Sequence, residues 1–184
     1  RSGLMSAAYP RAGSSASGGP TALGRLLAPT APAAAALVRG VVGLVFASEG
    51  IQKFLYAEAQ GSGRFARIGI PAPEVMGPFI GAVELVCGLL LLAGLGTRIA
   101  AAPLVADMLV ALASTKVPIL LGGGYWRFAH TFAPKAGVWA FLHESRTDLA
   151  MLACSAFLVL VGGDRWSLDA VLAGRSRRAG GRSS

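Results

Sequence analysis

The sequence predicts an all-α integral membrane protein, a four-helix transmembrane bundle, on the basis of three observations. Hydrophobic residues make up 54% of the 184 residues and charged residues 14%, whereas about 25% of the residues in a soluble domain are charged. Four long apolar runs follow one another, and each is close to the ~20 residues that a helix needs to cross ~30 Å of hydrocarbon. Most Lys and Arg residues lie in short segments that flank these runs.

The four expected helices form one membrane domain over residues 33–172. Their ranges are Ala33 to Tyr56, Met76 to Gly96, Arg98 to Leu121 and Thr147 to Gly163. The last range is the shortest, and an extra turn over residues 143–146 would lengthen it. Residues 1–32 are expected to form a disordered basic tail. They are rich in Ala, Gly, Ser and Pro, and such a segment can bury too little apolar surface to offset the loss of chain entropy on folding. Residues 173–184 form a second basic tail.

The distribution of Lys and Arg predicts how the bundle is oriented. With the N-terminus inside, ten of the 17 Lys and Arg residues lie on the inner side, and these residues are enriched in cytoplasmic segments of membrane proteins. We therefore expect a multi-pass protein of the bacterial inner (plasma) membrane with both termini in the cytoplasm. The net charge of +8 is interpreted as this topology signal and not as nucleic-acid binding, because no nucleic-acid recognition module is visible.

This orientation places two longer segments outside. The first, Ala57 to Val75, contains Ile70-Pro71-Ala72-Pro73, which resists helix formation and forces a bend. The second, Gly122 to Arg146, begins with three glycines and carries Tyr125, Trp126, Phe128, Phe132, Trp139 and Phe141. Its aromatic content favours a segment that lies in the membrane interface, and a ligand-binding lid is the alternative.

Ionisable residues inside the expected helices are the main candidates for a functional site, because charges are costly in hydrocarbon. Glu49 and Lys53 are four residues apart and share one helix face. If the first two helices are antiparallel neighbours, Glu84 joins them in a polar cluster in the outer half of the membrane, with Asp107 nearer the inner half. Two carboxylates at low dielectric do not both ionise cheaply, which favours a proton-handling or polar-substrate site. The alternative is structural, a cluster that fixes helix register through buried hydrogen bonds.

Small residues on the same helix faces predict close helix packing. They are Gly43 and Gly50 in the first helix and Gly77, Gly81 and Gly88 in the second. We expect the two helices to approach each other along these faces.

The histidines and cysteines predict neither a metal site nor a redox pair. His130 and His143 lie in the second outer segment without Cys or carboxylate residues at metal-ligand spacing, so exposed loop histidines are preferred over haem or metal ligands. Cys87 and Cys154 lie inside apolar runs without a CxxC pattern and are interpreted as small buried residues. Nucleotide-binding and hydrolase motifs are absent from the sequence as well.

Several short motifs, taken together, resemble the DoxX family of small four-helix bacterial membrane proteins. The similarity runs from about Leu37 to Leu172 and rests on the order and spacing of the motifs. In chain order they are Glu49-Gly50-Ile51-Gln52-Lys53-Phe54, Gly69-Ile70-Pro71-Ala72-Pro73, Glu84-Leu85-Val86-Cys87-Gly88, Gly94-Leu95-Gly96-Thr97-Arg98 and Gly162-Gly163-Asp164-Arg165-Trp166-Ser167-Leu168-Asp169. The first is similar to the family's Gly-x-x-Lys-Phe and the last to its terminal Gly-x-x-Ser-Leu-Asp.

The resemblance implies a redox-linked function. Some members of the family are subunits of thiosulfate:quinone oxidoreductase, and others are tied to thiol redox homeostasis in membrane complexes. By this likeness we expect a redox-associated, quinone- or thiol-linked membrane subunit, with quinone as the implied ligand and Glu49, Lys53 and Glu84 bordering its site. The alternative is a non-catalytic accessory subunit that packs against other membrane protein subunits. A small transporter has less support, because no inverted repeat is apparent.

Overall fold

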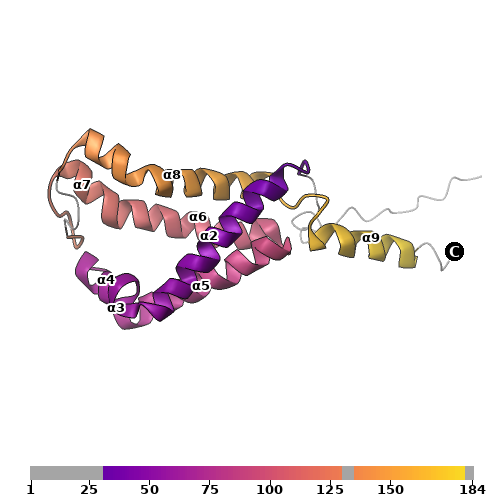
Figure 1. Ribbon diagram of the computed structural model, residues 1–184, viewed down its shortest axis with the longest axis horizontal. Helices are drawn as coiled ribbons and strands as arrows, with labels where there is room; N and C mark the ends of the chain where they lie inside the picture. The colour runs from indigo at the N-terminus through magenta and orange to yellow at the C-terminus, as the bar shows by residue number, and fades with distance from the viewer. Residues whose placement is uncertain (1–30, 130–134, 181–184) are drawn as a thin grey trace, which may run out of the picture.

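The computed structural model describes residues 31–129 and 135–180, so nearly all of the expected tail over residues 1–32 lies outside the described residues. The bundle consists of α2 (Ala35–Leu55), α5 (Pro73–Ala93), α6 (Thr97–Ala111) and α8 (Val138–Val161). A π-helical segment, η1 (Leu112–Lys116), continues α6 into α7 (Val117–Leu121). Figure 1 shows α3, α4 and α7 at one end of the bundle, here called the distal end, and α9 leading away from the other, proximal end.

Three helical segments are long and apolar enough to cross a membrane. They are Ala35–Leu55, Pro73–Ala93 and Thr97–Leu121. α8 has 24 residues, or about 36 Å of helix, but is more polar because it includes Glu144, Arg146 and Asp148. In the part of the chain that the structure describes, the only strand-like features are isolated β-bridges. The prediction of an all-α membrane bundle is confirmed.

The helix bounds differ from the expected ranges by more than three residues at two places. α8 begins at Val138 instead of Thr147, and its first turns are held to η1 by a salt bridge of 3.2 Å between Lys116 and Asp148. Part of the expected C-terminal tail belongs to α9 (Leu168–Gly180). Both differences concern polar sequence, which carries no hydropathy signal that separates a helix from a loop.

The first outer segment is helical over most of its length. It forms α3 (Ala57–Gln60) and α4 (Ser62–Ile68). α4 packs against α5, and α3 contacts α2 and α4. A Cβ atom on Gly77 would lie 2.6 Å from the backbone nitrogen of Ser62, so glycine at this position allows the close approach. The expected bend follows α4, where Ala72 has a left-handed backbone with φ of 48° just before α5.

α2 and α5 pack against each other along a line of glycines. A Cβ atom on Gly50 would lie 2.6 Å from the carbonyl oxygen of Gly81, and one on Gly43 would lie 2.8 Å from that of Gly88. Glycine permits two helix backbones to approach this closely because it has no side chain. α6 and α8 form a second pair in extensive contact. The bundle therefore consists of two helix pairs.

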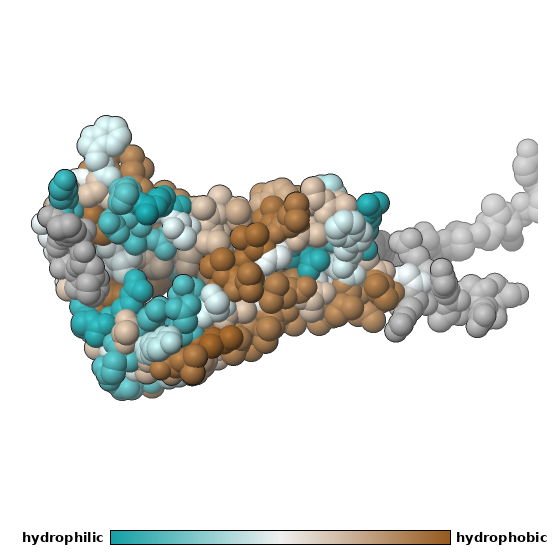
Figure 2. Space-filling view, viewed as in Figure 1, coloured by the Kyte–Doolittle hydropathy of each residue, from teal (hydrophilic) through white to brown (hydrophobic). Residues whose placement is uncertain are grey.

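The exterior of the bundle is apolar. Many large hydrophobic side chains are exposed along the long helices, among them Val41, Leu44, Ile51, Phe79, Val86, Leu89, Leu109, Val110 and Leu160. Figure 2 shows hydrophobic surface along the middle of the bundle and hydrophilic side chains gathered at the distal end. The core between the helices contains Val42, Phe46, Leu91, Leu104 and Leu158. Apolar residues on both the inside and the outside are expected where hydrocarbon, not water, surrounds the helices.

Candidate functional site

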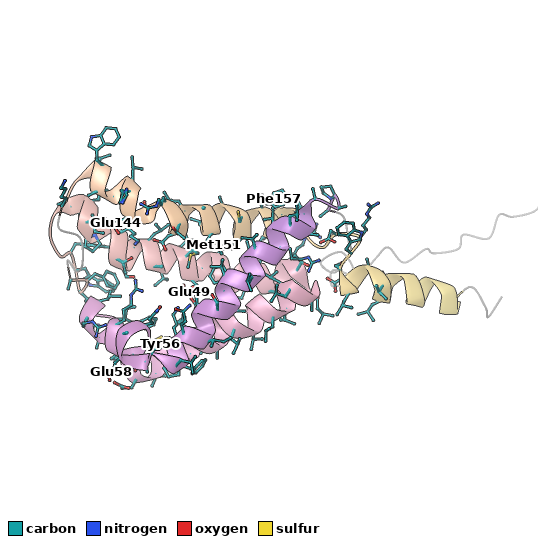
Figure 3. The ribbon with its side chains drawn as sticks, in the orientation of Figure 1. Glu49, Tyr56, Glu58, Glu144, Met151 and Phe157 are labelled. Carbon is teal, nitrogen blue, oxygen red and sulfur yellow. The ribbon has the colours of Figure 1, made fainter. Side chains whose placement is uncertain are left out.

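A cavity of about 540 Å³ lies between the α2–α5 pair and the α6–α8 pair. This volume is within the range of about 300–1,000 Å³ that is usual for small-molecule sites. Polar residues in its lining are Glu49, Lys53, Gln60, Arg64, Glu84, Asp107, Ser114, Thr115, Thr147 and Asp148, and the remainder of the lining is apolar. Figure 3 shows two of the lining residues, Glu49 on α2 and Met151 on α8.

An ion pair joins α2 to α5 inside this cavity. Nζ of Lys53 donates a hydrogen bond to Oε1 of Glu84 at 2.8 Å and lies 2.6 Å from Oε2. Only 3% of the Glu84 side chain and 11% of the Lys53 side chain are exposed. A carboxylate buried this deeply needs such a partner, because an uncompensated charge inside a membrane protein costs several kcal/mol.

Asp107 and Glu49 are two further carboxylic residues of the cavity lining. Asp107 lies 11 residues after Gly96, and Glu84 lies 10 residues before Gly94, so both are about 15 Å of helix from the turn that joins α5 to α6. The two carboxyl groups are close enough to influence each other's charge. The structure therefore places Asp107 beside Glu84 and not nearer the inner half, because the α5–α6 hairpin brings the two residues to one depth.

Sequence reasoning did not single out Thr115 or Asp148, which both line the cavity. Thr115 belongs to η1, and its hydroxyl donates to the carbonyl oxygen of Ala111 at 2.6 Å. π-helical segments often occur at functional sites. The available signal was Pro118, which has no N–H group and so cannot make the regular helical hydrogen bond to Ser114. For Asp148, the sequence offered no signal of its salt bridge with η1.

The distal end of the cavity is covered by the segment that contains α3 and α4. Its contribution to the lining consists of Gln60, Arg64, Phe65, Ile68 and Ile70. The side-chain amide of Gln60 donates to Oε1 of Gln52 at 2.9 Å, which attaches α3 to α2. Within the described ranges 122–129 and 135–146, no residue of the aromatic segment lines the cavity. Among the described residues, the segment that covers the cavity is therefore the first outer segment.

The aromatic segment forms a separate feature at the distal tip. Tyr125 and Phe128 exchange backbone hydrogen bonds of 3.1 and 2.9 Å, and the Tyr125 hydroxyl donates to the carbonyl oxygen of Ala113 at 2.7 Å. Trp126 is 83% exposed and Trp139 is 85% exposed. Exposed aromatic rings at the end of a membrane bundle suit the lipid–water interface. His130 and Phe132 lie outside the described residues.

A second buried polar network closes the proximal end of the bundle. Nε of Arg39 donates to Oδ2 of Asp164 at 2.9 Å, and its Nη1 donates to two carbonyl oxygens in the last turn of α5. A positive charge is favourable at that helix end. The carboxylate of Asp169 accepts hydrogen bonds of 2.9 and 3.1 Å from the N–H of Gly96 at the start of α6. This network ties the terminal motif to the α5–α6 turn and has a structural role.

The cavity has neither thiols nor a cluster of metal ligands. Among the described residues no group of three or more His, Cys, Asp and Glu side chains is arranged to hold a metal ion. Cys87 is buried, Cys154 is half-buried, both are free thiols, and neither lines the cavity. His143 is exposed. The cavity offers the ammonium group of Lys53, the guanidinium group of Arg64, several carboxyl groups, an amide and hydroxyls beside an apolar wall. Together these groups suit a molecule with a polar head and an apolar body.

These features define an α-helical integral membrane protein with a polar cavity between its helices. The chain belongs to the DoxX family, whose model matches residues 34–117. It is also 47% identical over 158 residues to an uncharacterized membrane protein of Mycobacterium tuberculosis, a similarity that covers 86% of this chain and 93% of the relative. No solved structure matches the chain significantly. The family predicted from the sequence motifs is confirmed.

Proposed function

We propose that the cavity binds a quinone-type molecule and that the chain is a redox-associated membrane subunit. The supporting observation is the combination of donors, acceptors and apolar wall in one cavity of about 540 Å³. The carbonyl oxygens of a quinone accept hydrogen bonds, and the ammonium group of Lys53 has three N–H donors, so it can donate to a quinone as well as to Glu84. Phe46 and Met151 belong to the apolar part of the lining, which suits a flat ring.

The carboxyl groups support the same proposal. Reduction of a quinone takes up protons as well as electrons. Glu49 and Asp107 line the cavity and have no ion-pair partner among the described residues, so each can exchange a proton with a bound quinone. The electrons would come from a partner protein. A thiol-linked role has less support, because both cysteines lie outside the cavity lining.

The alternative proposal, a non-catalytic accessory subunit, depended on small-residue faces that could receive a partner. Gly43, Gly50, Gly81 and Gly88 are buried, and their faces are filled by the contact between α2 and α5 of the same chain. The accessory role therefore keeps only the basic tails as support. For either role we propose the bacterial plasma membrane, with the distal end outside and both termini in the cytoplasm.

The test of quinone binding uses the full chain in lipid nanodiscs. A short-chain benzoquinone and a short-chain naphthoquinone are titrated separately, and the bound fraction is measured by ultrafiltration. Glu84→Gln and Lys53→Met each remove one charged partner of the cavity, and affinity is expected to fall by about tenfold or more. The double variant Lys53→Met/Glu84→Met removes both charges together, so it separates loss of binding from misfolding caused by one unpaired charge.

The matched control is Glu58→Gln. Glu58 is an exposed carboxylate of α3 that does not belong to the cavity lining, and Figure 3 shows it at the distal end of the molecule. This variant should bind both quinones with the affinity of the unchanged chain. Wild-type affinity in the single and double cavity variants, or no binding of either quinone by the unchanged chain, contradicts the proposal.

A further inference from the structure

Four apolar residues of the cavity lining are also exposed on the exterior of the bundle. Phe79 on α5 and Val110 on α6 are each 55% exposed, and Pro103 and Ala106 on α6 are exposed as well. All four belong to the lining. A residue that both lines a cavity and faces the exterior lies at an opening, so the cavity opens between α5 and α6.

This opening lies at the depth of the hydrocarbon. Phe79 is 15 residues before Gly94, and Val110 is 14 residues after Gly96, so both are about 21 Å of helix from the α5–α6 turn. Both helices belong to segments that are long and apolar enough to cross a membrane, and the hydrocarbon core is about 30 Å thick. The opening between them therefore faces lipid chains.

A second part of the rim is polar and lies near the distal end. Thr147 on α8 is exposed, Arg64 on α4 is half-buried, and 24% of the Asp148 side chain is exposed. A small water-soluble molecule would use this side. The two rims together give the cavity a polar end near water and an apolar side toward lipid, which is the distribution that an amphipathic molecule requires.

We propose that the cavity takes a lipid-soluble molecule that enters sideways between α5 and α6. Its polar head would lie at the Lys53–Glu84 pair, and its apolar chain would leave between Phe79 and Val110 into the bilayer. This proposal rests on the proposed function for the site of the head group. It adds the route of access and the chemical class of the ligand, a head group with a chain long enough to reach the bilayer.

The test measures which reagent reaches a thiol placed inside the cavity. In a background with Cys87→Ala and Cys154→Ala, the lining residue Thr115 is changed to Cys. The protein in lipid vesicles is treated at alkaline pH, where the thiol is ionised, with either a maleimide carried on an acyl chain or a charged maleimide that stays in water. Two variants are positive controls. Val86→Cys, at an exposed position of α5, should react with the acyl-chain maleimide, and Glu58→Cys, at the distal end, should react with the charged one.

A pair of variants on α6 then tests the route. Val110→Trp adds bulk at the opening. Leu109→Trp places the same side chain at the preceding residue, which is 53% exposed but does not line the cavity. We expect Thr115→Cys to react with the acyl-chain maleimide and not with the charged one. Val110→Trp should slow this reaction by about tenfold, and Leu109→Trp should leave its rate unchanged.

Faster reaction with the charged maleimide, reaction with neither reagent, or equal rates in Val110→Trp and Leu109→Trp would overturn the lateral route. The labelling does not require a quinone. Lateral labelling without quinone binding would therefore reject the proposed function alone, and quinone binding without lateral labelling would reject only the route.

Discussion

Replacement of Arg39 by methionine is expected to destabilise the proximal end of the bundle strongly. Arg39 is buried, pairs with Asp164 at 2.9 Å and donates to two carbonyl oxygens at the end of α5. Methionine fills similar space without charge, so Asp164, whose exposure is 0%, would lose its cation. Removal of one partner from a buried ion pair costs about 3–5 kcal/mol. For a chain of this length, that cost corresponds to a melting temperature lower by roughly 10 °C.

Thermal unfolding in one mild detergent, followed by circular dichroism, measures the effect. The double variant Arg39→Met/Asp164→Asn should recover part of the lost stability, because asparagine carries no charge. Its side-chain oxygen can still accept the hydrogen bond that the backbone N–H of Trp166 donates to Asp164 at 2.7 Å. The control is Arg165→Met, because Arg165 is exposed and its guanidinium carbon lies 5.6 Å from the centroid of the Trp166 ring. Equal melting temperatures of Arg39→Met and Arg165→Met would contradict a stabilising role of the ion pair. A double variant no more stable than Arg39→Met would contradict it as well.

Two further predictions concern helix packing and orientation. Gly50→Ala should lower stability by about 1–3 kcal/mol, because its Cβ would lie 2.6 Å from the Gly81 carbonyl oxygen; Gly40→Ala, on the same helix with no atom within 4 Å, should raise it by up to about 1 kcal/mol. Melting shifts of the same sign in thermal unfolding would contradict this account. The orientation is tested with variants that retain a single tryptophan, in right-side-out vesicles. With the termini in the cytoplasm, iodide added outside should quench the fluorescence of Trp139 and not that of Trp166. The opposite result would invert the orientation, and quenching of both would contradict a spanning bundle.

The sequence predicted the long helices and the charges within them well, because both are local properties. Hydropathy is a sum over neighbouring residues, so the apolar runs of α2, α5 and α6–α7 are visible without tertiary contacts. Charged residues inside such runs are equally visible, which is why Glu49, Lys53, Glu84 and Asp107 were named from the sequence. The start of α8 was not predicted, because residues 138–146 are mixed in polarity and give no hydropathy signal for a helix.

The partners of the charges required the tertiary structure. Arg39 is one of the ten inner-side Lys and Arg residues counted for the orientation, yet it pairs with Asp164, 125 residues later in the chain. For the aromatic segment, a ligand-binding lid was the alternative to an interfacial position, because long ordered loops are often functional. The structure instead shows α4 over the cavity, since α4 packs on α5, and the Tyr125 hydroxyl holds the aromatic turn to Ala113.

By itself the sequence determined that the chain is a helical membrane protein, and it predicted that several carboxyl groups and one lysine lie at the depth of the hydrocarbon. These conclusions depend on the transfer of side chains and backbone from water to hydrocarbon, which each segment undergoes independently of the others. Only the tertiary structure decided that Lys53 pairs with Glu84, that Asp107 lies beside them and that one cavity opens between α5 and α6. Those contacts depend on which helices pair and on how the paired helices are offset along their axes. Close approach at glycines of distant segments fixes the pairing and the offset.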